Sequence, residues 1–184
     1  MSNVVLIGKP GAGKGTLAKQ FEERYGFYIL TPGALYRREA ELKTEFGLIA
    51  KAYWADGNLC PDKMTNELVC HTLRNLNNQN VIFDGYPRSL SQARFLGNIS
   101  VIDLIIDLNI RDDISIKRLL ARREKENRLD DTEEIIKQRL IVYHCNNDEI
   151  IKYYSNNLNK YKTVDANLSR EEVYSAVEKL IVGK

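Results

Sequence analysis

The sequence predicts a three-layer α/β fold, with helices on both faces of a doubly wound, parallel five-stranded sheet. Short runs rich in valine and isoleucine recur along the 184 residues, and a stretch with helical periodicity follows each of them. Continuous apolar runs of this length are typical of parallel strands that are buried on both faces. The alternation of strands and helices therefore favours a single doubly wound domain.

The expected elements follow one another along the whole chain. Strands are expected at residues 4–7, 28–30, 81–83, 101–108 and 161–164. Helices are expected at residues 14–25, 33–45, 48–55, 62–75, 89–96, 112–124, 132–154 and 169–181. Ser169, followed by Glu171 and Glu172, is expected to cap the last helix, because serine accepts hydrogen bonds from first-turn N–H groups. Residues 31–74 show no convincing strand, so we expect a lobe that projects from the sheet.

Composition narrows the classes to which the chain can belong. Hydrophobic residues make up 43% and charged residues 28%, which excludes the disordered, collagen-like and membrane-spanning classes. The 27 basic and 25 acidic side chains leave a net charge of +2, which gives no electrostatic footprint for nucleic acid or a membrane surface. The N-terminal residues lack the pattern of a signal peptide or a membrane span, so we expect a cytoplasmic protein.

Cysteines and histidines give no metal-site pattern. Cys60, Cys70 and Cys145 are odd in number and lack C-x-x-C spacing, which argues against a disulfide framework or a zinc cage and favours reduced thiols. His71 and His144 lie on predicted helices without a partner at ligand spacing. For both histidines, packing or a surface position is favoured over metal binding or catalysis.

A glycine-rich segment at residues 8–16, with the sequence GKPGAGKGT, joins the first strand to the first helix. Glycines let backbone N–H groups curl around phosphate oxygens, the helix N-terminus adds a positive dipole, and Lys14 can reach the β- and γ-phosphates of a nucleotide. This is the context of a P-loop. The segment departs from the strict pattern, because Gly15 fills the serine or threonine position and Thr16 follows it. Whether a hydroxyl serves Mg²⁺ here is left open.

A second signal follows the third expected strand, which ends in Asp84 before a turn that leads to Arg88. An acid at the carboxyl end of a strand beside a P-loop can hold Mg²⁺ directly or through water, although an aspartate that caps a turn would look the same. Arg88 is more specific, since a guanidinium held by a turn near the switch point of the sheet can bind a phosphate with two hydrogen bonds.

Arginines are dense in one short region of the chain, at Arg118, Arg122, Arg123, Arg128 and Arg139. Arg118 and Arg122 are four residues apart and share one face of a predicted helix. Such runs are usually solvated surface charge. Beside a P-loop they gain a second meaning, because phosphoryl transfer needs several cations around its transition state.

Taken together, with order and spacing kept, these motifs resemble the adenylate kinases within the nucleoside monophosphate kinases. The resemblance is carried by residues 8–16, 33–37, 57–62, 84–88 with Gln92, 128–131 and 139–140. It implies Mg²⁺-dependent transfer of the ATP γ-phosphoryl group to AMP, giving two ADP, by a monomer. No nucleic acid or membrane partner is expected.

The resemblance also implies a division of the chain. A core would comprise residues 1–30, 61–121 and 132–184, a lobe that binds the monophosphate would span about residues 31–60, and a lid over ATP about residues 122–131. The lid is of the short type and has neither cysteine nor histidine, so no zinc is expected.

Roles on the ATP side are carried over from the resemblance residue by residue. The phosphates of ATP would be bound by Gly11, Ala12, Gly13, Lys14, Gly15 and Thr16. Arg118 would pack on the ATP base and Arg122 would bind an ATP phosphate. The residues expected to stabilise the transferring group are Lys14, Arg88, Arg122, Arg128 and Arg139. Asp84 would organise the water shell of Mg²⁺.

On the acceptor side, Arg37 and Arg88 would clamp the phosphate of AMP, and Gln92 would read its base. The full set implied for AMP is Thr31, Pro32, Arg37, Asn58, Leu59, Cys60, Gly85, Tyr86, Pro87, Arg88, Gln92, Arg128 and Arg139. At Asn58, Leu59 and Cys60 the backbone is expected to contact the base.

Departures from the family pattern leave two alternatives open. Pro32 replaces a threonine whose hydroxyl normally touches AMP, and Ala34 replaces an acid. Loss of such a hydrogen bond costs about 1 kcal/mol, so a kinase for UMP, CMP or several monophosphates is the second hypothesis. Gln92 favours AMP, because relatives that use pyrimidines tend to have asparagine there. A regulatory protein that binds nucleotide without turnover is the third, and the retained arginines argue against it.

Overall fold

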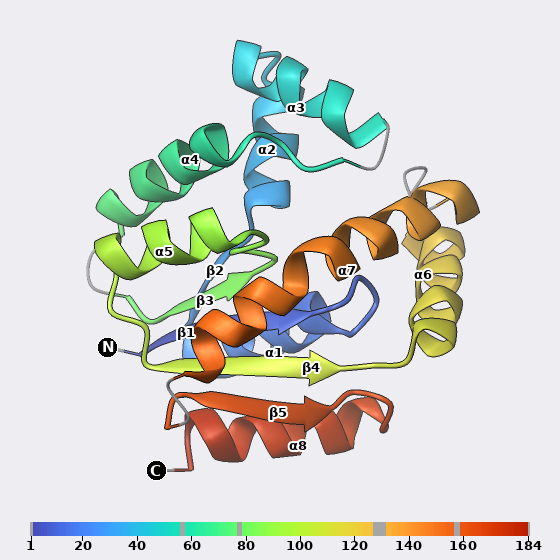
Figure 1. The fold of residues 1–184 in the computed structure, drawn as a ribbon. Coiled ribbons are helices and arrows are strands. Elements are labelled where there is room, and N and C mark those ends of the chain that lie inside the picture. Colours follow the sequence, from blue (N-terminus) through green and yellow to red (C-terminus); the bar gives the residue numbers. More distant parts are fainter. Residues whose placement is uncertain (1, 56–57, 77–78, 127–131, 157–158, 184) are drawn as a thin grey trace.

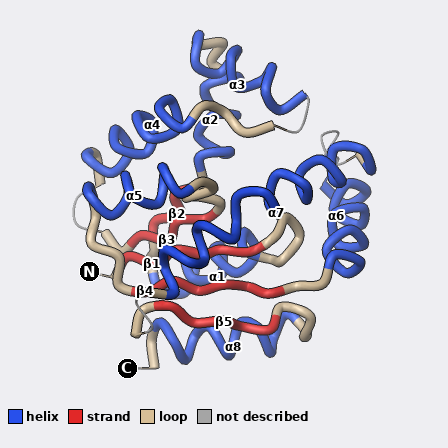
Figure 2. Tube along the Cα trace, viewed as in Figure 1, coloured by secondary structure: helices blue, strands red, loops and turns tan. Residues whose placement is uncertain are grey.

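The computed structural model describes residues 2–55, 58–76, 79–126, 132–156 and 159–183. Five parallel strands form one sheet in the order β2-β3-β1-β4-β5, with helices on both sides (Figure 1; Figure 2). The strands are β1 (Asn3–Gly8), β2 (Tyr28–Leu30), β3 (Val81–Asp84), β4 (Leu104–Asn109) and β5 (Tyr161–Asp165). The predicted doubly wound, parallel five-stranded fold is confirmed.

Helices connect consecutive strands and cover the two faces of the sheet. They are α1 (Lys14–Tyr25), α2 (Pro32–Glu41), α3 (Glu45–Ala55), α4 (Asp62–Arg74), α5 (Leu90–Ile99), α6 (Asp112–Glu126), α7 (Glu133–Ser155) and α8 (Arg170–Ile181). Apolar residues of α1 and α8 pack on one face of the sheet, and those of α4, α5 and α7 pack on the other.

The central strand β1 shows why the sheet is buried on both faces. Its residues alternate between the two cores, with Val4 and Leu6 in the core that contains α1 and Val5 and Ile7 in the core that contains α5. Successive side chains of a strand point to opposite faces, so a strand with a core on each side must be apolar at every position. β3 and β4 flank β1, and the strand order reverses at β1. The carboxyl edge beside this reversal is where ligands bind in folds of this class.

Four predicted boundaries are wrong by three or four residues, among them the start of α3, expected at residue 48 and observed at Glu45, and the end of α5, expected at residue 96 and observed at Ile99. The helix expected at residues 33–45 ends at Glu41, because Lys43 adopts a positive φ of 55° and Thr44 accepts a hydrogen bond from the Gly47 N–H (3.1 Å), which starts α3. The strand expected from residue 101 begins at Leu104, since Val101 is 73% exposed. The predicted cap of the last helix is confirmed, with Ser169 and Glu172 forming a capping box.

Helices α2 and α3 lie away from the sheet, above its carboxyl edge in Figure 1. They pack on a small core of their own, which contains Tyr36, Ala50 and Cys60, with Met64 and Leu68 of α4 against it. No strand lies between residues 31 and 74 in the described part of the chain, as the sequence indicated.

The three cysteines are free in the structure. None of the helices in the described part of the chain is both long and apolar enough to cross a membrane. Of the expected lid, residues 127–131 lie outside the described residues, and residues 122–126 form the end of α6.

Candidate active site

The glycine-rich loop turns from β1 into α1 in a conformation that requires glycine. Gly11 has φ 82°, and a Cβ at this position would lie 2.7 Å from the carbonyl oxygen of Ser115 on α6. Gly13 has φ 95°, precedes the first residue of α1 and provides no side-chain cap. The first turn of α1 contains no acidic residue. Its N–H groups and dipole are thus available to an anion, as a P-loop requires.

Lys14 folds back over this loop. Its Nζ donates to the carbonyl oxygens of Gly8 (2.6 Å) and Lys9 (2.9 Å). Desolvation lowers the pKa of Lys14 to about 8, Asp84 opposes this shift, and Arg88 and Arg122 add to it. A lysine from the first helix, an aspartate from β3 and two arginines from other elements therefore lie close enough to interact.

Asp84 lies against the start of α1. It ends β3, where its Cα pairs with Leu6 of the neighbouring β1. A Cβ at Gly15 would lie 3.3 Å from Asp84 Oδ2, so glycine at this position leaves the carboxylate room to face the loop. Mg²⁺ in nucleotide kinases is typically held by one or two carboxylates, several waters and the substrate phosphates. A single carboxylate beside a phosphate loop fits that donor set. No group of three or more Asp, Glu, His or Cys side chains is gathered anywhere in the described ranges.

Arg88 occupies the turn after β3. Its Nε donates to the carbonyl oxygen of Gly85 (2.8 Å), whose φ is 70°. Desolvation lowers the pKa of Arg88, Asp84 opposes the shift, and Arg139 and Arg37 add to it. The predicted acceptor pair, Arg37 and Arg88, is therefore brought together with Arg139 of α7.

A buried hydrogen-bond network supports the turn that carries Arg88. Gln92, only 2% exposed, accepts from the Arg88 N–H at Oε1 (2.7 Å) and donates from Nε2 to Asp62 Oδ1 (2.8 Å). Ser89 Oγ donates to the other oxygen of Asp62 (2.6 Å). Tyr86 is 1% exposed, and its hydroxyl donates to Asn66 Oδ1 (2.6 Å). The ring of Tyr86 is thus part of the core, and only its backbone can face a ligand.

The remaining predicted residues are spread over the surrounding elements. Pro32 is the buried first residue of α2, following Thr31. Asn58 is exposed, Leu59 is half-buried and Cys60 is buried between α3 and α4. Arg118 of α6 donates from its guanidinium to the carbonyl oxygen of Leu168 (3.2 Å). Arg128 lies outside the described residues.

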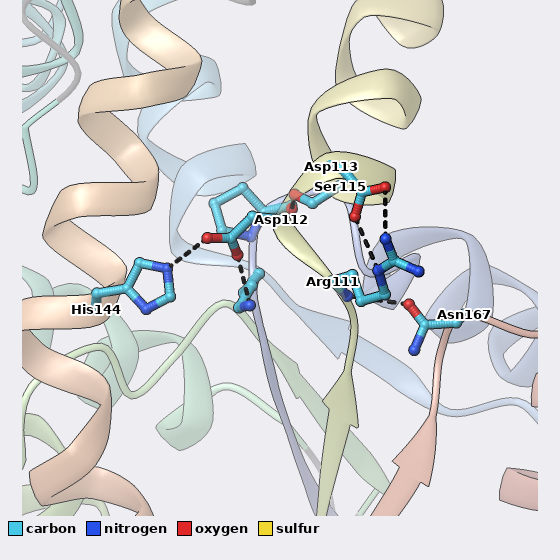
Figure 3. A network of polar contacts seen from close by, with 8 residues as sticks. Arg111, Asp112, Asp113, Ser115, His144 and Asn167 are labelled. Carbon is cyan, nitrogen blue, oxygen red and sulfur yellow. Dashed lines mark hydrogen bonds and ion pairs between the residues drawn. The ribbon is translucent and has the colours of Figure 1, made fainter.

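One cluster was not predicted from the sequence. His144 of α7, which has no partner at ligand spacing in the sequence, lies with Nε2 3.2 Å from Asp112 Oδ2 (Figure 3). Lys9 of the P-loop contacts Oδ1 of the same carboxylate (2.5 Å). Lys9 and Asp112 are 103 positions apart along the chain, and Asp112 and His144 are 32 positions apart. No local pattern could have joined them.

A P-loop with converging cations on a doubly wound sheet defines the class of P-loop phosphotransferases. Comparison with known proteins narrows the class. The family model described as adenylate kinase matches residues 6–159, and the chain belongs to this family.

Several similar proteins carry the same name. An adenylate kinase of Phocaeicola vulgatus is 35% identical over 98% of this chain and 100% of its own length. One of Mycobacterium tuberculosis is 38% identical over 94% of both chains. One of Bacteroides thetaiotaomicron is 33% identical over 98% of this chain and 100% of its own. The predicted family is confirmed.

Proposed function

We propose that the P-loop and Lys14 bind the phosphates of ATP, while Arg88 and Arg37 hold the phosphate of AMP at the same carboxyl edge of the sheet. As a member of the adenylate kinase family, the chain transfers the γ-phosphoryl group of ATP to AMP and gives two ADP. The observation that carries the assignment of residues is that the start of α1, with Lys14, and the turn with Arg88 meet at the carboxylate of Asp84, which lies 3.3 Å from a Cβ placed at Gly15 and interacts electrostatically with both cations.

On the donor side, the loop supplies fixed charge. The N–H groups at the start of α1 receive phosphate oxygens without further rearrangement. Lys14 is held by two backbone carbonyls, which are neutral partners that an anionic phosphate can replace. A bound polyanion then favours the protonated ammonium, which follows the γ-phosphoryl group as it moves.

On the acceptor side, Arg88 is aimed by its own turn. The bond from its Nε to Gly85 leaves the outer edge of the guanidinium for a phosphate. Arg139, Arg122 and Arg128 would add charge around the transferring group. This chemistry needs positioning and charge rather than a general base.

Asp84 and the phosphates of ATP would hold Mg²⁺ through water. When bound, Mg²⁺ neutralises the developing charge on the phosphate oxygens. Asp84 itself contributes a fixed carboxylate that also pairs electrostatically with Lys14 and Arg88.

Selection of the acceptor base is assigned to Gln92 and the backbone at residues 58–60. The Gln92 side chain is buried, and its amide is held in one orientation by two hydrogen bonds. Its Oε1 accepts from the Arg88 N–H and its Nε2 donates to Asp62. The names of the relatives favour AMP over the pyrimidine monophosphates that Pro32 and Ala34 left open. A binder without turnover is not favoured either, since those relatives are named as kinases.

The lobe of about residues 31–60 and the lid of about residues 122–131 would close over the two substrates and exclude water. The small core of α2 and α3 supports a lobe that can move as a unit. The monomeric state and the cytoplasmic location stay predictions.

The function is tested by following ADP formation from Mg-ATP with AMP, CMP, UMP, dTMP and GMP, with the Lys14→Ala variant as the blank. We expect AMP to have the highest kcat/KM. A preference for a pyrimidine monophosphate would make Pro32 the determinant of specificity. ATP binding without ADP formation from any acceptor would favour a regulatory protein.

A further inference from the structure

The charged cluster around the first turn of α6 lies outside the residues assigned to either substrate. Asp112, the first residue of α6, contacts Lys9 at Oδ1 (2.5 Å) and His144 at Oδ2 (3.2 Å). The next residue, Asp113, makes an ion pair with Arg111 (3.0 Å), and no hydrogen bond or ion pair joins it to another element within the described part of the chain (Figure 3). Two adjacent aspartates with equally exposed side chains, 50% each, thus have different partners.

The Lys9 contact reaches the core of the P-loop. The Lys9 side chain is only 17% exposed, and its carbonyl oxygen accepts from both Lys14 Nζ (2.9 Å) and the Ala12 N–H (3.1 Å). A displaced Lys9 would therefore displace a carbonyl that holds the lysine for the ATP phosphates. Pro10 is fixed from the same helix, since Ser115 Oγ donates to its carbonyl oxygen (2.5 Å).

The cluster also joins the loop to the helices that carry arginines. Asp112 begins α6, which carries Arg118 and Arg122, and His144 lies on α7, which carries Arg139. The hydrogen bond from Lys9, which is the largest cause, and the contact with His144 hold the pKa of Asp112 below its usual range, although desolvation opposes them. Lys9 and His144 therefore both help to keep the Asp112 carboxylate charged.

We propose that Asp112 is a positioning residue for ATP, which fixes the P-loop through Lys9 and aligns it with α6 and α7. Asp112 touches neither substrate in this account. It acts through the Lys9 carbonyl on Lys14. The inference rests on the proposed binding of ATP phosphates by the P-loop.

The test compares Asp112→Asn with Asp113→Asn. Both substitutions remove one negative charge from the first turn of α6 and leave its length unchanged, so net charge and helix dipole change equally. We expect Asp112→Asn to raise the KM for ATP about fivefold and the KM for AMP less than about twofold, because a partly buried ion pair is lost only on the ATP side. Asp113→Asn should change neither KM by more than about twofold.

Further variants separate positioning from general stability. Lys9→Met should raise the KM for ATP by the same factor, and adding Asp112→Asn to it should have little further effect, since both remove one contact. Asp112→Glu should recover most of the loss. Titration calorimetry with ATP should show the same order of affinities, and the melting temperatures of Asp112→Asn and Asp113→Asn should be similar.

Equal effects of Asp112→Asn and Asp113→Asn on the KM for ATP would overturn the inference. So would additive effects of Lys9→Met and Asp112→Asn, or equal rises in both KM values. If Asp112→Asn fails to fold, the KM for ATP of Lys9→Met tests the inference by itself, and an unchanged value overturns it. A failure of the proposed function looks different, because the unsubstituted protein would then form no ADP from ATP and AMP, whatever the variants show.

Discussion

The two sides of the site are built in different ways. On the donor side, Lys14 is held by backbone carbonyls, and the loop is fixed by the half-exposed carboxylate of Asp112 on α6, which His144 of α7 also contacts. On the acceptor side, Arg88 stands on a buried network of neutral and charged hydrogen bonds around Gln92. A polyanion can replace the carbonyl partners of Lys14, whereas the Gln92 network must persist for Arg88 to keep its place. The donor side is thus organised by charge and the acceptor side by buried hydrogen bonding.

Removing Lys14 should have the greatest effect on turnover. Lys14→Ala eliminates the cation nearest the start of α1, and we expect kcat/KM to fall about a thousandfold while the fold is kept. Steady-state ADP formation and circular dichroism measure the two properties. A fall of less than about tenfold would contradict the role of Lys14.

Removing Arg88 should lower turnover about a hundredfold or more, through the acceptor side. Arg94→Ala, on the exposed face of α5 a few residues later, is the matched control and should leave the rate unchanged. The measurement is kcat and KM for AMP at saturating ATP. If both arginine variants lose activity equally, Arg88 has no special part in binding AMP.

Alkaline pH should weaken the donor side alone. Lys14 in the free protein loses its proton as the pH rises through about 8. In the complex, the negative charge of the bound polyphosphate keeps Lys14 protonated. ATP binding then takes up a proton, and its affinity should decline up to about tenfold per pH unit above that value. Calorimetric titrations with ATP at several pH values measure the decline.

Lys14→Arg is the control for this pH effect, because a guanidinium does not titrate in that range. Its affinity for ATP should stay constant where that of the unsubstituted protein falls. Parallel declines in the two proteins would assign the pH effect to another group.

Removing the hydrogen bonds of the Gln92 side chain should lower both the stability of the fold and the selectivity for the acceptor. Gln92→Ala leaves the Arg88 N–H and one oxygen of Asp62 without their partner, which should lower the free energy of unfolding by about 1–3 kcal/mol. Urea unfolding measures this, with exposed Gln79→Ala as the control. The preference for AMP over UMP should fall as well. Equal stability of the two variants would show that the network contributes nothing.

Local patterns predicted most of the fold. Helix α1 has the expected bounds because glycines stand at both ends, Gly13 before it and Gly26 after it. The break between α2 and α3 was predicted at residues 46–47 but lies at residues 42–44, because its place depends on the backbone of Lys43 and the hydroxyl of Thr44.

The site was predicted less completely, and the reason is distance along the chain. The P-loop and the Asp84 to Arg88 turn are local motifs, so the sequence identified them. The bond between Gln92 and Asp62 spans 30 residues, and that between Lys9 and Asp112 spans 103. Such pairs are set by which strands lie side by side, and composition and spacing give no sign of them.

The most direct test of the two-sided site is to titrate ATP and AMP separately into the unsubstituted protein, Lys14→Ala and Arg88→Ala. We predict a crossed pattern, in which Lys14→Ala loses affinity for ATP and keeps that for AMP, while Arg88→Ala does the reverse. If each variant weakened both ligands equally, the donor and acceptor sides would not be separate, and the account would be wrong.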